Sequence, residues 1–156
     1  MNAETMVTTL KGAISNVLET MFFQPVQFVD FSCSLQEWFS GRDSLLGATI
    51  GFRGPSSGSM FFLSPMKVLR EMTANFLGLS EEEINQEQQM DTIKEILNMT
   101  GGHMLSLIDK EGLFKIGIPE LIDIHDHTNT RLEELRGDTL LIQTEDDHLA
   151  AGILLD

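Results

Sequence analysis

The side chains best suited to chemistry in this sequence lie between Gln86 and Asp109. Apolar residues recur there at helical spacing, which predicts one long helix. An advance of about 100° per residue places Asp91, Glu95, Asn98 and Gly102 within an arc of about 60°. The opposite side carries an apolar set: Ile93, Ile96, Leu97, Thr100, Met104, Leu107 and Ile108. Burial of that set predicts an exposed stripe of two carboxylates and one carboxamide, groups that bind cations and form hydrogen bonds.

A solvated helix face is the ordinary explanation of an isolated Glu-x-x-Asn, and two details argue against it here. Gly101 and Gly102 are adjacent inside the predicted helix, where each costs on the order of 1 kcal/mol relative to alanine. Such a cost suits a face that another molecule approaches closely. Asn98 is a weak helix former in mid-helix, with no structural duty evident from the sequence. We therefore interpret this stripe as the candidate functional site.

The elements that must position this helix are readable along the first half of the chain. A helix is predicted over 5–23, followed by strands over 26–33, 45–53 and 58–63. Gly54 to Ser57 has the composition of a hairpin turn between the last two strands. Ser64-Pro65 is expected to open a further helix, with the proline at its first helical position, and Gly78 to end it.

The second half repeats this order of elements. Ser80 followed by three acids is expected to begin a helical segment that leads into the long helix. A strand over 113–118 and a hairpin, with strands 139–144 and 148–155 and a turn at 145–147, complete the prediction. The fold class is therefore α+β, a duplicated helix-strand-hairpin unit whose antiparallel sheet carries two long helices on one face. A single domain over 1–156 is expected.

Composition excludes several classes of function. The 10 basic and 24 acidic residues give a net charge of −14, which lacks the basic footprint of nucleic-acid or anionic-membrane binding. The acidity belongs to the half that follows Gly78. A lone cysteine, Cys33, allows no internal disulfide and indicates a reducing compartment. With no apolar run long enough for a membrane span, the sequence predicts a soluble cytoplasmic protein.

The run DTIKEILNMTGG, from Asp91 to Gly102, resembles the signature of the CheC/CheX/FliY chemotaxis phosphatases, and in particular the single-site CheX branch. That signature is an acidic or serine residue, Glu-x-x-Asn on a surface helix, and a later proline, here Pro119 at a slightly shorter gap than usual. Residues 58–78 also look like the family's strand followed by a helix. The first helix carries Asn16-Val17-Leu18-Glu19, the reverse order, so one active site per chain is inferred.

The resemblance implies a chemistry. Members of the family hydrolyse the aspartyl phosphate of a CheY-type response-regulator receiver, which supplies its own Mg²⁺, so no cofactor is expected on this chain. By resemblance, Asn98 would orient the attacking water and Glu95 would pair with the receiver's lysine. Asp91, Gly101 and Gly102 are expected to contact the partner. The family also implies a homodimer, for which the terminal hairpin is the expected free edge.

Other interpretations remain. His125 and His127, with Asp123 and His148, could form a metal site, although an exposed loop explains their spacing more simply. A noncatalytic receiver-binding or flagellar-switch-like domain of the same fold is the main alternative function. A small-molecule enzyme would need a pocket that the sequence does not indicate.

Overall fold

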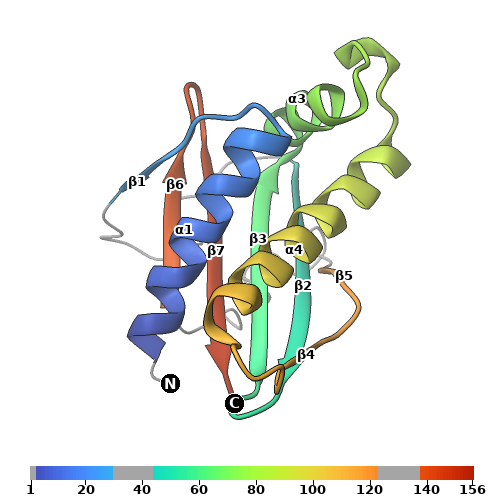
Figure 1. The fold of residues 1–156 in the computed structure, drawn as a ribbon. Coiled ribbons are helices and arrows are strands. Elements are labelled where there is room, and N and C mark those ends of the chain that lie inside the picture. The colour runs from blue at the N-terminus through green and yellow to red at the C-terminus, as the bar shows by residue number, and fades with distance from the viewer. Residues whose placement is uncertain (1–2, 30–43, 123–137) are drawn as a thin grey trace.

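The computed structural model describes residues 3–29, 44–122 and 138–156. Two long helices, α1 (Ala3–Met21) and α4 (Gln86–Ile108), lie side by side on one face of a seven-stranded antiparallel sheet (Figure 1). A third helix, α3 (Met66–Leu77), lies at one end of the sheet, and a short 3-10 helix, η1 (Glu81–Glu83), joins it to α4. This α+β architecture confirms the predicted fold class. None of the described helices is long and apolar enough to cross a membrane.

The order of the strands is β1-β6-β7-β3-β2-β4, and β5 also pairs with β2. The strand after each long helix therefore joins the hairpin of the other half, β1 beside β6 and β5 beside β2, while β3 and β7 pair at the centre. This exchange between halves is the topology expected of a duplicated unit. The strands are β1 (Gln27–Val29), β2 (Leu45–Arg53), β3 (Gly58–Pro65), β4 (Lys115–Ile116), β5 (Glu120–Ile122), β6 (Asp138–Gln143) and β7 (His148–Leu155).

The core lies between the helices and the sheet. Alternate strand residues such as Ile50, Phe62 and Ile153 face this layer, as the two-residue period of a strand requires. The helices contribute their apolar stripes, including Ile14 of α1 and Ile96 of α4, both fully buried. Burial on this scale fixes the rotation of α4 about its own axis, and that rotation decides which of its side chains reach solvent.

One of the two helix starts near the middle of the chain differs from its prediction. Pro65 is not the first helical residue: it pairs with Leu45 as the last residue of β3 and keeps an extended backbone, with ψ 142°. Ser80 forms a capping box with Glu83 at the start of η1, the short helical segment expected before the long helix, which begins at Gln86 as predicted. The cap of α4 is Asn85, whose Oδ1 accepts the backbone N–H of Gln88 at 2.8 Å, while the backbone N–H of Asn85 donates to Gln88 Oε1 at 2.9 Å.

Two predictions about strands are also corrected. The expected strand over 113–118 is reduced to β4, because the Asp109 carboxylate accepts the backbone N–H of Leu113 at 2.7 Å and that of Phe114 at 2.9 Å, which holds them in a loop. The hairpin of β6 and β7 is present with its predicted turn, but it is no free edge. Because β6 pairs with β1 and β7 pairs with β3, the outermost strands of the described sheet are β1 and the β4–β5 segment. Cys33, Asp123, His125 and His127 lie outside the described residues.

Candidate functional site: an exposed acid-amide stripe on α4

The stripe predicted on α4 is present in the structure. Asp91, Asn98 and Gly102 are exposed and Glu95 is half-buried. The opposite side of the helix is buried against the sheet and the other helices, and it includes Ile93, Ile96, Leu97, Thr100 and Met104. Leu107 departs from the expected buried set: it is 53% exposed, whereas Leu105 and Ile108 of the same turn pack in or on the core.

Glu95 and Asn98 are three residues apart, so their side chains are neighbours on the helix surface. Within the described part of the chain neither side chain has a hydrogen-bond or ion-pair partner. Other polar side chains of the same region are engaged in structure: Asn85 and Gln88 cap the helix start and Asp109 holds the loop that follows. The acid-amide pair is therefore left available to a molecule that approaches from solvent.

The two adjacent glycines have different surroundings. A Cβ at Gly102 would meet nothing within 4 Å, so this position keeps the surface beside Asn98 low. Gly101 is buried, and a Cβ there would lie 2.5 Å from Ile116 Cδ1 and 2.8 Å from Met60 Cε. Gly101 thus serves the packing of α4 on β3 and β4. From the sequence Gly101 is expected on the partner-contacting face, but the structure places it on the buried side of α4. Gly102 is exposed as expected.

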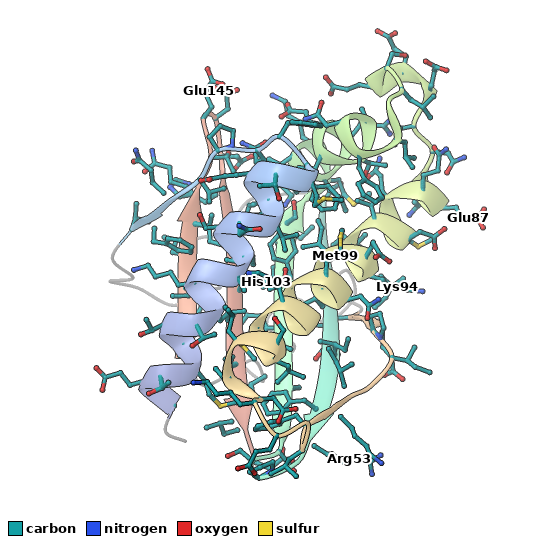
Figure 2. All side chains as sticks on the ribbon, viewed as in Figure 1. Arg53, Glu87, Lys94, Met99, His103 and Glu145 are labelled. Atoms are coloured by element: carbon teal, nitrogen blue, oxygen red, sulfur yellow. The ribbon has the colours of Figure 1, made fainter. Side chains whose placement is uncertain are left out.

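Three further side chains flank the stripe. Lys94, the one lysine or arginine of α4, extends from the side of the helix away from α1, whereas His103 lies on the side toward α1 (Figure 2). Met99, next to Asn98, is half-buried and packs on the core. The stripe is therefore bordered by a cation on one side and by half-buried side chains on the other.

A shallow groove of about 500 Å³ adjoins the stripe at its N-terminal end. The sequence analysis did not identify this groove. Two of its lining residues, Asp91 and Glu95, belong to the stripe itself. Its signal in the sequence is slight: Leu77 is apolar but falls at the very end of its helix, immediately before Gly78. The lining residues are Phe76, Leu77, Gln88, Asp91, Thr92 and Glu95.

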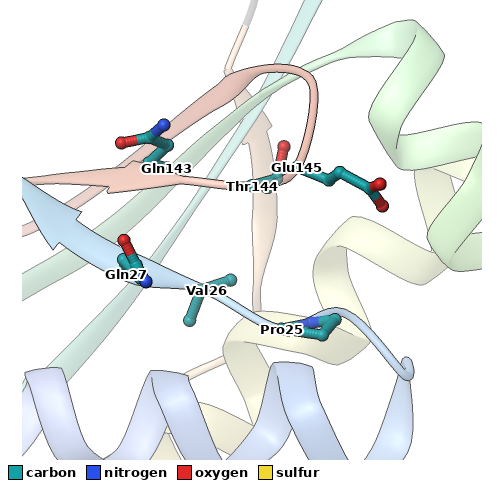
Figure 3. A pocket seen from close by; sticks show the side chains of 6 residues that line it. All are labelled: Pro25, Val26, Gln27, Gln143, Thr144 and Glu145. Carbon is teal, nitrogen blue, oxygen red and sulfur yellow. The ribbon is translucent and has the colours of Figure 1, made fainter.

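A second depression, of about 440 Å³, lies far along the sheet between β1 and the turn of the last hairpin (Figure 3). Its lining includes Gln27 and Gln143, which are paired across the two strands. Thr144 donates its hydroxyl to the Asp147 carbonyl at 3.0 Å and so shapes the turn. Its acid and amides, Glu145 with Gln27 and Gln143, come from two strands and a turn and not from one face of a helix. Likewise, no group of three or more His, Cys, Asp or Glu side chains suited to a metal ion occurs among the described residues.

The first long helix carries no equivalent pair. The two helices can be aligned by their buried residues, with Leu10 of α1 equivalent to Ile93 of α4. In this alignment Gly12 is equivalent to Glu95 and Ser15 to Asn98. The Ser15 hydroxyl donates to Glu19 Oε1 at 3.3 Å on its own helix. On α1 the exposed acid and amide, Asn16 and Glu19, stand in the reverse order and Glu19 is engaged by Ser15, so among the described residues the free Glu-x-x-Asn pair is on α4.

Comparison with known proteins identifies relatives of this fold. The family model described as chemotaxis phosphatase CheX matches residues 46–139, whereas no curated protein sequence matches. CheX from Vibrio vulnificus is similar in structure, with a TM-score of 0.75 and 20% identity over 97% of this chain and 96% of that chain. CheX from Borrelia burgdorferi, solved in a CheX-CheY-BeF3-Mg²⁺ complex, gives a TM-score of 0.71 and 15% identity over 96% of each chain.

A more distant likeness is Thermotoga maritima FliY, with a TM-score of 0.61 and 13% identity over 99% of this chain and 91% of that chain. The family match spans more than half of the chain and contains the whole of α4, including Asp91 to Gly102. The chain therefore belongs to the CheX family of chemotaxis phosphatases.

Proposed function

We propose that this chain is a protein phosphatase that hydrolyses the aspartyl phosphate of a CheY-like receiver domain, with Asn98 and Glu95 as its working residues. The observation that carries the proposal is the exposure of this acid and this amide on one face of α4, unengaged within the described structure. Membership of a phosphatase family supports it, as does a structurally similar CheX solved in complex with CheY.

The chemistry asks little of the phosphatase. Hydrolysis forms a bond between a water oxygen and phosphorus and breaks the bond to the aspartyl oxygen, releasing inorganic phosphate and a free carboxylate. Phosphoryl transfer of this kind depends on positioning and on charge stabilisation. The receiver brings Mg²⁺ and a lysine to its own site. This chain needs only to insert a group that fixes the water in line with the phosphorus.

Asn98 suits this task, since its carboxamide both accepts from and donates to a water without removing a proton as a strong base would. Its position on a packed helix gives the precision that a loop would lack. Glu95, one turn earlier, is placed to pair with the receiver's lysine, which docks the helix against the receiver. Asp91 and Gly102 extend the same contact, the first by its charge and the second by its lack of a side chain.

The test measures phosphate release from a phosphorylated receiver with catalytic amounts of the protein. We expect Asn98→Ala to lower the stimulated rate by about 10²-fold or more, the scale of a lost positioning effect, with an unchanged far-ultraviolet circular dichroism spectrum. Glu95→Gln should weaken binding to the receiver as well as turnover. Turnover by Asn98→Ala at the wild-type rate would exclude this mechanism.

The first helix supplies the matched controls. Asn16 is an exposed asparagine and Glu19 an exposed glutamate on α1, so Asn16→Ala and Glu19→Gln make the same chemical changes away from the stripe. Both should leave the rate unchanged. A protein that binds the receiver tightly but releases no phosphate would instead be the noncatalytic receiver-binding module.

A further inference from the structure

The groove between the end of α3 and the first half of α4 is the feature that the catalytic pair does not explain. It is continuous with the stripe, because Asp91 and Glu95 line both. We propose that this groove receives an apolar side chain of the receiver, from a surface with neighbouring basic groups, and that Leu77 thereby sets affinity and receiver choice. The proposal rests on the proposed function, since it takes the receiver as the molecule that reaches Asn98.

A protein interface needs more area than the acid-amide stripe offers. Specific interfaces bury about 800 Å² on each partner, which the few side chains of the acid-amide stripe cannot supply. A receiver that reaches Asn98 must therefore cover surface beside the stripe. At the N-terminal end of the stripe that surface is the groove, a concave region into which a projecting side chain fits.

One wall of the groove is apolar and is formed by Phe76 and Leu77. Leu77 is 43% exposed although its helix buries most of its other apolar residues. Phe76 lines the groove and stacks on Phe22 at a centroid distance of 4.8 Å, so the wall is rigidly supported. Buried aromatic support beneath an exposed leucine is the arrangement of an interface anchor site, where burial of apolar area gives affinity.

The end of α1 is joined to the helix that carries Leu77. The Asn75 side-chain amide of α3 donates to the Phe22 carbonyl at 3.0 Å and so ties the end of α1 to α3. The next residue, Phe23, is 67% exposed and has a positive φ of 52°, a conformation that costs energy in a residue with a large side chain. Phe23 at this junction and Leu77 are both large apolar side chains left exposed, of the kind that protein-binding surfaces present.

Charge selects the kind of partner. The residues that line the groove include two carboxylates, Asp91 and Glu95, and no lysine or arginine. The segment that comes just before Gln88 in the sequence, from Glu81 to Glu87, adds further acids. A partner with an apolar side chain ringed by basic groups is complementary to this surface, whereas an acidic one is repelled. A second copy of this chain, with its net charge of −14, is for the same reason the poorer occupant.

The experiment compares Leu77→Lys with Leu107→Lys. Leu107 is a leucine of similar exposure at the far end of α4, outside the groove, so it controls for a new surface charge. Each variant is titrated with a receiver activated by beryllium fluoride, which gives Kd. Phosphate release is measured separately with the phosphorylated receiver, which gives kcat and KM. For Leu77→Lys we expect Kd and KM to rise about tenfold or more with kcat nearly unchanged, since Asn98 and Glu95 are intact. Leu107→Lys should match the wild type, and Leu77→Met should retain most of the affinity.

Outcomes separate this inference from the proposed function. If the wild type releases phosphate but Leu77→Lys and Leu107→Lys have equal Kd values, the groove is not a receiver contact and the phosphatase assignment stands. If Leu77→Lys only changes the oligomeric state in sedimentation velocity, the groove binds a second copy and the inference is overturned. Thermal unfolding of both variants checks that each is folded, and Leu77→Ala, for which a raised Kd is also expected and an unchanged Kd would overturn the inference, supplies the reading should Leu77→Lys unfold.

Discussion

Thr100 shows at the level of one residue how the buried side of α4 is built. Its hydroxyl is fully buried and has no hydrogen-bond partner among the residues that the structure describes. A buried hydroxyl without a partner keeps its desolvation cost, which is about 1 to 3 kcal/mol. The threonine therefore adds little to the stability of the helix that carries the acid-amide pair.

Replacement of this hydroxyl by a methyl group tests that conclusion. Thr100→Val keeps the shape of the side chain, and we expect it to raise the free energy of unfolding by about 1 kcal/mol. Denaturant titration at neutral pH measures the change, with Thr8→Val on the exposed face of α1 as the control. An equal or lower stability of Thr100→Val would mean that the hydroxyl has a partner in solution. Phosphatase activity should be unaffected, since this side chain points away from the stripe.

At the level of the helix, the two neighbouring glycines of α4 have opposite duties. Gly101 allows α4 to approach Met60 of β3 and Ile116 of β4, whereas Gly102 faces open space. We expect Gly101→Val to destabilise the fold by about 1 to 3 kcal/mol through overpacking, as measured by denaturant unfolding. Gly102→Ala should instead stabilise it by about 1 kcal/mol, the difference in helix propensity. Equal effects of the two changes would contradict the assigned orientation of α4.

The helical period of the sequence predicts some features of α4 and misses others. The helical period places Glu95 and Asn98 outward correctly, because apolar burial alone decides the rotation of the helix. The period cannot show that Gly101 is buried, since the residues that cover it arrive from strands distant in sequence. It also assigns Leu107 to the core, although this side chain is exposed while Leu105 and Ile108 beside it pack in or on the core.

Elements that depend on pairing rather than on period are predicted less well. Pro65 has the composition of a helix start, but its pairing with Leu45 holds it in β3. The loop before β4 is decided by the Asp109 carboxylate, a contact with no sequence signature. The groove beside Leu77 requires two helices to be placed relative to each other, which no local pattern encodes. The exposed position of the acid-amide pair is thus readable from sequence, while the surface that flanks it is not.

At the scale of the whole molecule, the fold gathers acids that are remote in sequence. Glu71 of α3 lies near Glu81 of η1 and near Asp146 and Asp147 in the β6–β7 turn. Burial raises the pKa of Glu71 above its ordinary value of 4.5, and these three carboxylates raise it further, against the opposing effect of Lys67. Part of the net charge of −14 is thus concentrated at the end of the molecule that holds α3.

This raised pKa gives a pH dependence of stability with a definite sign. The folded chain binds the Glu71 proton more tightly than the unfolded chain, so the contribution is favourable below pH 4.5 and is lost as pH rises through the folded-state pKa. Glu71→Gln removes the charge of this partly buried side chain, and we expect a higher melting temperature than that of the wild type at pH 7. The difference should shrink toward zero as the pH falls below 4.5. Glu111→Gln, on an exposed loop, is the matched control and should show no such dependence. A Glu71→Gln variant that melts at or below the wild-type temperature at pH 7 would mean that Glu71 gains more from Lys67 than it loses to its acidic neighbours.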